Sequence, residues 1–131
     1  MKTVLITGGT RGIGLSTAIN FQQHGWEVYI TSRKQENLDL VITEHPQLKG
    51  FVARADDLAA ASETCMKIKD ETGSLDVLIN NAGTNPSGGS LMDVELSAVQ
   101  KTWDVNLMGP LMWTREAVKA GLTESVLNVC S

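Results

Sequence analysis

The sequence has few of the residues that mark several common classes of protein. Its two cysteines and two histidines stand in no spacing typical of a zinc site or a disulfide framework, so neither is predicted. Eleven basic against 15 acidic residues give a net charge of −4, which argues against nucleic-acid binding and a polybasic membrane anchor. No apolar run approaches the roughly 18 residues of a membrane span. These absences predict a reduced, cytoplasmic protein that binds neither nucleic acid nor membrane.

What is present is the composition of a globular protein, 42% hydrophobic and 20% charged, in a length that fits one domain over residues 1–131. Short apolar runs alternate with longer helical segments. Strands are predicted over residues 2–7, 27–31, 50–53, 76–80 and 125–130. Helices are predicted over residues 12–24, 35–45, 59–72, 97–107 and 111–119, the last two separated at Gly109 and Pro110.

This alternation predicts an α/β fold with a parallel sheet. Right-handed crossovers between parallel strands place helices on both faces, which makes the sheet doubly wound. A polar loop over residues 84–90 follows the fourth predicted strand. Open α/β sheets bind ligands at the carboxyl ends of their strands, so this edge is the expected site.

A glycine-rich turn joins the first predicted strand to the first helix, and residues 7–14 read TGGTRGIG. Glycine lacks a Cβ, so its backbone can approach a pyrophosphate closely. The following helix offers free N–H groups and a positive dipole end to the anion. The G-x-x-x-G-x-G spacing differs from the G-x-G-x-x-G fingerprint. A purely structural turn is the alternative, but the strand–turn–helix context favours a nucleotide site.

Four segments together resemble the short-chain dehydrogenase/reductase family. They are TGGTRGIG at residues 7–14, NNAG at 80–83, WDVNL at 103–107 and VLNVCS at 126–131. Their order and their places on the predicted elements match the family along the whole chain. The resemblance implies a Rossmann-type sheet of five strands in the order 3-2-1-4-5. Residues 81–86 and 91–94 look most like 3-oxoacyl-(acyl carrier protein) reductases, a narrower and weaker likeness.

The resemblance implies a nicotinamide cofactor. In the family the glycine turn holds it, here through Gly8, Thr10, Arg11, Gly12, Ile13 and Gly14. An acid at the end of the second strand favours NAD(H), but Ser32 and Arg33 stand there instead. Arg11 and Arg33 can pair with a 2′-phosphate, so NADP(H) is predicted over NAD(H). The alternative is that Arg33 and Lys34 only solvate a loop.

Further cofactor contacts are implied after the third and fourth strands. Asp57 and Leu58 resemble the family's Asp-hydrophobic pair that recognises adenine, although the spacing to Gly73 is shorter than usual. The neighbouring Asp56 is an alternative for this role, and either aspartate can instead cap the following helix. The family also lines the cofactor's ribose with three residues, here Asn81, Ala82 and Gly83. Asparagine amides at such a turn can equally hold the sheet together.

Carbonyl reduction needs a proton donor and hydrogen bonds to the developing oxyanion. The family supplies them with asparagine, serine, tyrosine and lysine, and Asn106 and Ser131 match the first two. Their structural alternatives are a polar residue at a helix end and an exposed terminal residue. The sequence contains no Tyr-x-x-x-Lys, and its only tyrosine, Tyr29, lies in the second strand.

The resemblance therefore implies an NADP(H)-dependent oxidoreductase that acts on a small-molecule carbonyl or alcohol, with a 3-oxoacyl thioester as the narrower candidate. The chain resembles the N-terminal half of the family, and without the Tyr–Lys pair we expect it to be inactive alone. A non-catalytic dinucleotide-binding module is the alternative. A homo-oligomer is expected for the full-length form, because family members often associate through helices flanking the site, of which residues 111–119 form one.

Overall fold

The computed structural model of the chain describes residues 1–86 and 89–130. Five strands form one parallel sheet in the order β3-β2-β1-β4-β5, which confirms the predicted α/β architecture. The strands are β1 (Thr3–Ile6), β2 (Glu27–Ser32), β3 (Lys49–Val52), β4 (Val77–Asn80) and β5 (Ser125–Asn128). The helices are α1 (Gly12–Gln23), α2 (Gln35–Glu44), α3 (Leu58–Thr72), α4 (Leu96–Trp103) and α5 (Gly109–Lys119), with short turns η1 (Leu91–Asp93) and η2 (Asp104–Met108).

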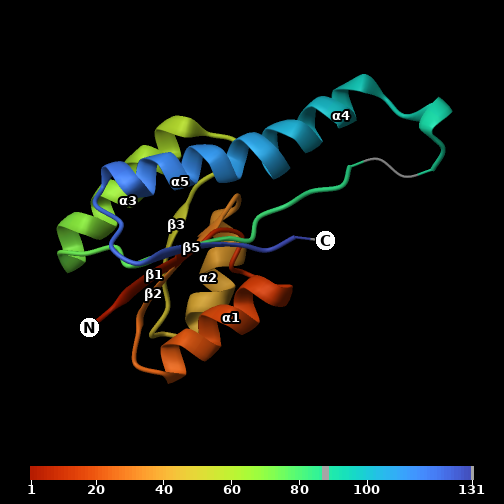
Figure 1. The fold of residues 1–131 in the computed structure, drawn as a ribbon. Helices are drawn as coiled ribbons and strands as arrows, with labels where there is room; N and C mark the ends of the chain where they lie inside the picture. Colours follow the sequence, from red (N-terminus) through yellow and green to blue (C-terminus); the bar gives the residue numbers. More distant parts are fainter. Residues whose placement is uncertain (87–88, 131) are drawn as a thin grey trace.

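The sheet lies between two layers of helices, α1 and α2 on one face and α3 and α5 on the other (Figure 1). Side chains of β1 alternate between the two layers. Leu5 joins the cluster beneath α3 and α5, whereas Val4 and Ile6 join the cluster beneath α1 and α2. Because both faces are covered, this central strand is apolar at three successive positions. None of the helices in the described part of the chain is long and apolar enough to cross a membrane.

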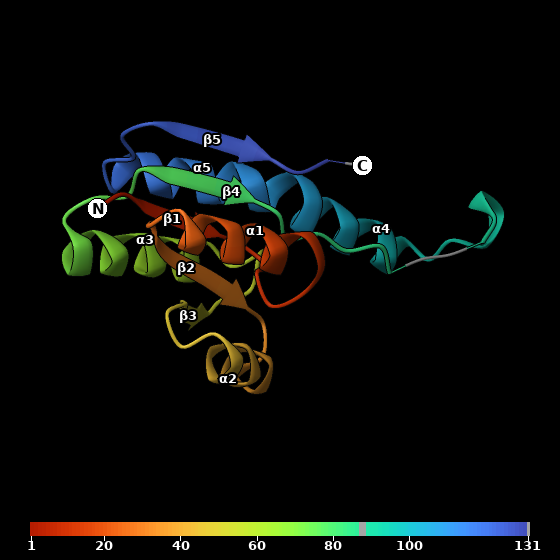
Figure 2. The same cartoon turned by 90° about the horizontal axis from the view of Figure 1, so that it is seen from below.

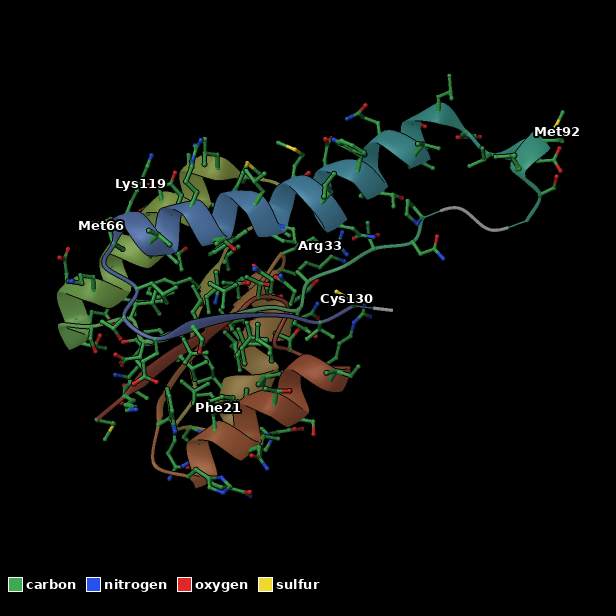
Figure 3. All side chains as sticks on the ribbon, viewed as in Figure 1. Phe21, Arg33, Met66, Met92, Lys119 and Cys130 are labelled. Carbon is green, nitrogen blue, oxygen red and sulfur yellow. The ribbon has the colours of Figure 1, made fainter. Side chains whose placement is uncertain are left out.

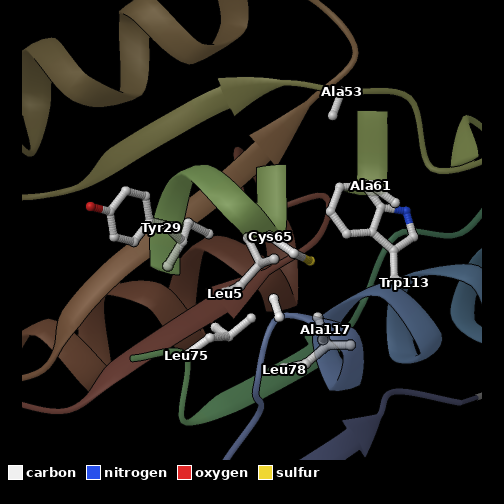
Figure 4. Close-up of a cluster of buried hydrophobic side chains, with 11 residues drawn as sticks. Leu5, Tyr29, Ala53, Ala61, Cys65, Leu75, Leu78, Trp113 and Ala117 are labelled. Carbon is white, nitrogen blue, oxygen red and sulfur yellow. The ribbon is translucent and has the colours of Figure 1, made fainter. Parts of the chain in front are cut away.

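Trp113 is the largest side chain in the cluster beneath α3 and α5 (Figure 4). Its indole N–H donates to the carbonyl of Ala55 at 3.1 Å. That bond satisfies the one polar group of a buried tryptophan. It also fixes the turn that follows β3 against α5. A Cβ added to Gly109 would lie 2.9 Å from the same carbonyl oxygen, so a glycine is needed where the turn approaches the helix.

The helical segment over residues 96–119 is continuous, so the predicted break at Gly109 and Pro110 is wrong. Between α4 and α5 the chain forms the π-helical turn η2, in which the Gly109 N–H donates to the Asp104 carbonyl five residues back. Pro110 has no N–H for the carbonyl four residues back, and a wider turn accommodates the missing bond. Pro110 then stands in the first turn of α5, where proline is tolerated. The other predicted bounds agree within two residues.

Candidate functional site

A cavity of about 420 Å³ opens at the carboxyl edge of the sheet. Five segments form its wall: the glycine turn after β1, the end of β2 with the start of α2, the turn after β3, the segment after β4, and the α4–η2 helix. The lining residues are Gly8, Thr10, Arg11, Gly12, Ile13, Thr31, Ser32, Arg33, Lys34, Asn37, Ala53, Arg54, Ala55, Asp56, Asn81, Ala82, Gly83, Thr84, Lys101 and Val105. β1 lies between β2 and β4, so the strand order reverses here, where doubly wound sheets bind ligands.

The glycine turn is packed tightly against the segment that follows β4. Gly8 and Gly12 have φ values of +63° and +57°, which favour glycine. A Cβ added to Gly8 would lie 3.0 Å from the Cα of Ala82. A Cβ added to Gly14 would overlap the Asn81 amide and lie 2.5 Å from the Gly8 carbonyl oxygen. Gly14 therefore supports the turn from beneath and does not line the cavity.

Side-chain hydrogen bonds hold these two segments together. The Thr7 hydroxyl oxygen accepts from the N–H groups of Asn81 and Ala82, each at 3.0 Å. The Asn81 amide donates to the carbonyls of Thr7 at 3.1 Å and Gly8 at 3.0 Å. The side chain of Asn81 thus has the structural role that the sequence left open. Its backbone, with Ala82 and Gly83, remains part of the cavity wall.

The cavity wall is strongly cationic although the chain as a whole is acidic. Its cationic residues are Arg11, Arg33, Lys34, Arg54 and Lys101. Within the described part of the chain, Asp56 is the one acid in the wall. A wall of this kind raises the local concentration of anionic ligands.

The end of β2 carries the residues on which the choice of cofactor depends. Ser32 is buried, and its hydroxyl donates to the Lys34 carbonyl at 3.2 Å and accepts from the Lys34 N–H at 3.3 Å. This local turn leaves Arg33 exposed at the carboxyl edge of the sheet, between the two helical layers (Figure 3). Ser32 and Arg33 both line the cavity.

Asp57 caps a helix in the structure. Its carboxylate accepts from the Ala60 N–H at 3.1 Å, at the N-terminus of α3. Neither Asp57 nor Leu58 lines the cavity, whereas Asp56 does. An adenine-recognising role for Asp57 and Leu58 stays a prediction that the cavity wall does not favour.

Asn106 lies on η2 and joins the helix to the segment after β4. Its carbonyl oxygen accepts from the Thr84 N–H, and its amide donates to the Thr84 carbonyl, both at 2.8 Å. A Cβ added to Gly83 would lie 3.5 Å from the same side-chain oxygen. Asn106 therefore adjoins the end of the cavity formed by residues 82–84. Ser131 lies outside the described residues.

Tyr29 does not line the cavity. It is buried in the cluster beneath α3 and α5, and its hydroxyl donates to Glu71 at 2.6 Å. Burial and the bond to Glu71 raise the pKa of Tyr29 above its ordinary value. This hydroxyl cannot serve as a proton donor at the carboxyl edge of the sheet.

Three cationic residues of the wall were not predicted as site residues from the sequence, namely Lys34, Arg54 and Lys101. Arg54 lies two residues after the end of β3, so its place just after a strand was a usable signal. Lys101 stands inside α4, and nothing local indicates that this helix approaches the cavity. Its position follows from the packing of the long helix across the sheet edge.

A doubly wound parallel sheet with a glycine-rich turn and a cationic cavity at its switch point is the arrangement of Rossmann-type proteins. The family model described as short chain dehydrogenase matches residues 2–131. The chain therefore belongs to the short-chain dehydrogenase/reductase family of oxidoreductases.

Relatives with curated names agree with this membership. Dehydrogenase/reductase SDR family member 4 of Homo sapiens is 35% identical over 124 residues, covering 89% of this chain and 44% of that protein. Glucose 1-dehydrogenase of Gluconobacter oxydans (strain 621H) is 31% identical, covering 95% of this chain and 48% of that protein. The chain thus spans slightly less than half the length of these relatives.

Solved structures of the family match the fold closely. ElxO with NADP bound has a TM-score of 0.91 and 30% identity, covering 99% of this chain and 55% of that one. A variant of actinorhodin polyketide ketoreductase with NADPH has a TM-score of 0.93 and 27% identity, covering 99% of this chain and 53% of that one. Both similar structures carry a nicotinamide cofactor with a 2′-phosphate.

Proposed function

We propose that this chain, as a nucleotide-binding domain, binds NADP(H) in the cavity at the carboxyl edge of the sheet. The observation that carries the proposal is the cationic wall at the end of β2, where Ser32 and Arg33 stand in place of an acid. The glycine turn supports it, because side chains at Gly8 or Gly14 would fill the space around the turn. Similar structures with NADP or NADPH bound support the same choice of cofactor.

The predicted residues that line the cavity would each hold a part of the cofactor. The glycine turn and the N-terminus of α1 would hold the pyrophosphate, and Arg11 would add positive charge there. Ser32 and Arg33 hold the adenosine 2′-phosphate. The backbone of Ala82 and Gly83 lies against the ribose. The bound cofactor supplies or accepts a hydride, and the protein's task is to orient it towards a carbonyl or alcohol.

We assign roles in the reaction to two residues, Asn106 and Ser131. Asn106 holds Thr84 by two hydrogen bonds and so fixes the position of the segment that follows β4. Ser131 donates a hydrogen bond to the substrate oxygen. Because Tyr29 is buried beneath α3, we propose that the 131-residue chain alone binds cofactor without turnover.

The substrate class is proposed more narrowly from resemblance. Residues 81–86 and 91–94 are similar to 3-oxoacyl-(acyl carrier protein) reductases, so a 3-oxoacyl thioester is the substrate to test first. Similarity to a structure named as a polyketide ketoreductase supports a ketone substrate. Two free cysteines, Cys65 and Cys130, agree with a reducing compartment, and we propose the cytoplasm.

The first experiment is a titration of the purified chain with NADPH and NADH, followed by nucleotide fluorescence. We expect saturable binding with NADPH at least about tenfold tighter, because two charge-assisted contacts act on the 2′-phosphate. Gly14→Ala is the matched negative control, since its Cβ displaces the turn. Equal affinity for the two nucleotides would contradict the cofactor proposal.

Turnover is measured on the same sample with a 3-oxoacyl thioester and NADPH. We expect oxidation of NADPH no faster than the substrate-free blank. Oxidation above that blank would overturn the proposal that this chain alone is inactive. Binding without turnover in a longer form that contains a Tyr-x-x-x-Lys would favour the non-catalytic dinucleotide-binding module instead.

A further inference from the structure

An ion pair stands in the cavity wall on the turn after β3. The Nε of Arg54 lies 3.1 Å from one carboxylate oxygen of Asp56, and a terminal nitrogen lies 3.4 Å from the other. The two parallel contacts set the guanidinium plane, as in other bidentate pairs. Arg54 remains about half exposed, with 54% of its side chain accessible. A side chain oriented and accessible in this way is suited to bind a ligand in the cavity.

The turn that carries this pair is fixed from three sides. The Ala53 N–H donates to the Ser32 carbonyl at 2.9 Å, which extends the β2–β3 ladder by one residue. The Asp57 N–H donates to the Arg54 carbonyl at 3.2 Å. The indole of Trp113 holds the Ala55 carbonyl at 3.1 Å. The backbone at Arg54 is therefore set before any ligand arrives.

Strand register brings Arg54 and Arg33 to the same edge of the sheet. Ser32 and Val52 are partners in the parallel β2–β3 pairing. Arg33 is the next residue after Ser32, and Arg54 follows Val52 by two, so both leave neighbouring strands at the same edge. Both line the cavity. Two guanidinium groups thus stand at the end of the cavity where β2 finishes.

Asp56 offsets only part of this charge, because the described part of the cavity wall holds five cationic residues and one acid. The hydrogen bond from Arg54 outweighs partial burial and holds the pKa of Asp56 below its ordinary value, and Lys101 acts in the same direction. The carboxylate therefore stays ionised and paired with Arg54. Asp56 uses two of the five N–H groups of Arg54. The others have no acceptor among residues 1–86 and 89–130.

We propose that Arg54 is a specificity residue that donates to the 2′-phosphate of bound NADP(H), alongside Arg33, with Asp56 orienting it. This inference rests on the proposed function. It assigns a cation after β3 to the phosphate monoester, where the family resemblance suggested an acid for adenine. Because NADH lacks that phosphate, Arg54 strengthens the binding of NADPH and not that of NADH.

The test compares Arg54→Gln with Arg115→Gln by fluorescence titration of the purified chain with NADPH and NADH. Arg115 is an equally exposed arginine on α5 that does not line the cavity, and it controls for the loss of one charge. We expect Arg54→Gln to weaken NADPH binding about tenfold, as for the loss of a hydrogen bond to a charged group, and NADH binding less than about twofold. Arg115→Gln leaves both affinities unchanged within about twofold, because surface charges act weakly.

The salt dependence of binding gives a second readout. The affinity of the unaltered chain for NADPH should fall more steeply with ionic strength than that of Arg54→Gln, since one phosphate contact is lost in the variant. Thermal unfolding checks that Arg54→Gln is folded. Arg54→Lys keeps the charge but not the two-point contact with Asp56. We expect its affinity for NADPH to lie between those of the unaltered chain and Arg54→Gln.

Failure of this inference and failure of the proposed function give different results. If the unaltered chain prefers NADPH and Arg54→Gln retains that preference in full, Arg54 is not a specificity residue although the proposed cofactor stands. An equal loss for NADPH and NADH overturns the inference too, because Arg54 would then act on a shared part of the nucleotide. If the unaltered chain binds neither nucleotide, the proposed function itself fails.

Discussion

Two glycines of the turn after β1 are required for different physical reasons. Gly12 has a left-handed φ of +57° with open space around it, so a methyl group there fits but the backbone is strained. We expect Gly12→Ala to lower the free energy of unfolding by about 1 kcal/mol. At Gly14 there is no room for a side chain, since an added Cβ would overlap the Asn81 amide and meet the Gly8 carbonyl. For Gly14→Ala we expect a loss of about 2–3 kcal/mol.

Urea denaturation of the two variants and the unaltered chain measures these losses. Gly14→Ala should also abolish nucleotide binding, because it moves the Gly8 backbone. A larger loss for Gly12→Ala than for Gly14→Ala would show that backbone strain, and not contact with the segment after β4, governs the turn.

At single residues, the sequence indicated the backbone geometry well where local chemistry decides it. The glycine turn needs positive φ values and close packing, and its residue pattern alone indicates both. Asp57 shows the opposite case. A helix cap and a ligand contact both require an acid just after a strand, so only the fold could separate them. Arg54 faces the cavity because β2 and β3 are neighbours, which is a property of the sheet and not of the local sequence.

Among the elements, Asp76 joins the starts of strands at the edge of the sheet opposite the cavity. It is buried, and its carboxylate accepts from the Thr3 N–H at 2.7 Å, the Thr123 hydroxyl at 2.6 Å and the Ser74 hydroxyl at 3.1 Å. Burial alone would raise its pKa, but these hydrogen bonds outweigh burial and hold the pKa below its ordinary value. A carboxyl with a lowered pKa stabilises the folded state only when it is ionised.

We expect Asp76→Asn to lower the free energy of unfolding at pH 7 by about 2 kcal/mol, because one charge-assisted acceptor is lost from a buried network. The contribution of Asp76 is fully present above its unfolded pKa and is lost as the pH falls through the lower folded value. The difference between Asp76→Asn and the unaltered chain should therefore shrink below about pH 4. Urea midpoints measured from pH 7 to pH 3 test this. Asp70→Asn, at an exposed site on α3, is the matched control. A difference that does not change with pH would contradict the role of ionised Asp76.

The long helix over residues 96–119 shows why one element was predicted incorrectly. Proline inside a helical pattern usually ends the helix, and Gly109 before it strengthened that expectation. In the structure the wider turn of η2 accommodates Pro110, which has no N–H to donate. Position 109 has no room for a side chain, because a Cβ there would meet the Ala55 carbonyl oxygen. Neither feature is visible in the helix's own sequence. The continuous helix matters for the site because it brings Lys101, Val105 and Asn106 to the cavity edge.

For the molecule as a whole, the helix over residues 96–119 exposes a stripe of apolar side chains to solvent. Large hydrophobic side chains recur every three or four residues along it and are about half exposed or more. They are Leu96, Val99, Trp103, Leu107 and Leu111. The segment before α4 extends away from the sheet, so the first part of the helix has little of the fold around it (Figure 2). Repeated exposed apolar residues on one helix indicate a surface that another chain covers.

We therefore expect the protein to self-associate through this stripe and Leu111→Glu to shift it towards the 14.1 kDa monomer. Leu111 is 52% exposed, so a charge there is solvated in the monomer but becomes buried if two stripes pack together. Leu40→Glu is the matched control, because Leu40 is a 67% exposed leucine on α2, on the other face of the sheet. Sedimentation velocity over a range of concentrations measures the shift. An unaltered chain that stays monomeric at high concentration, or an equal shift for Leu40→Glu, would show that the stripe is not the contact between copies.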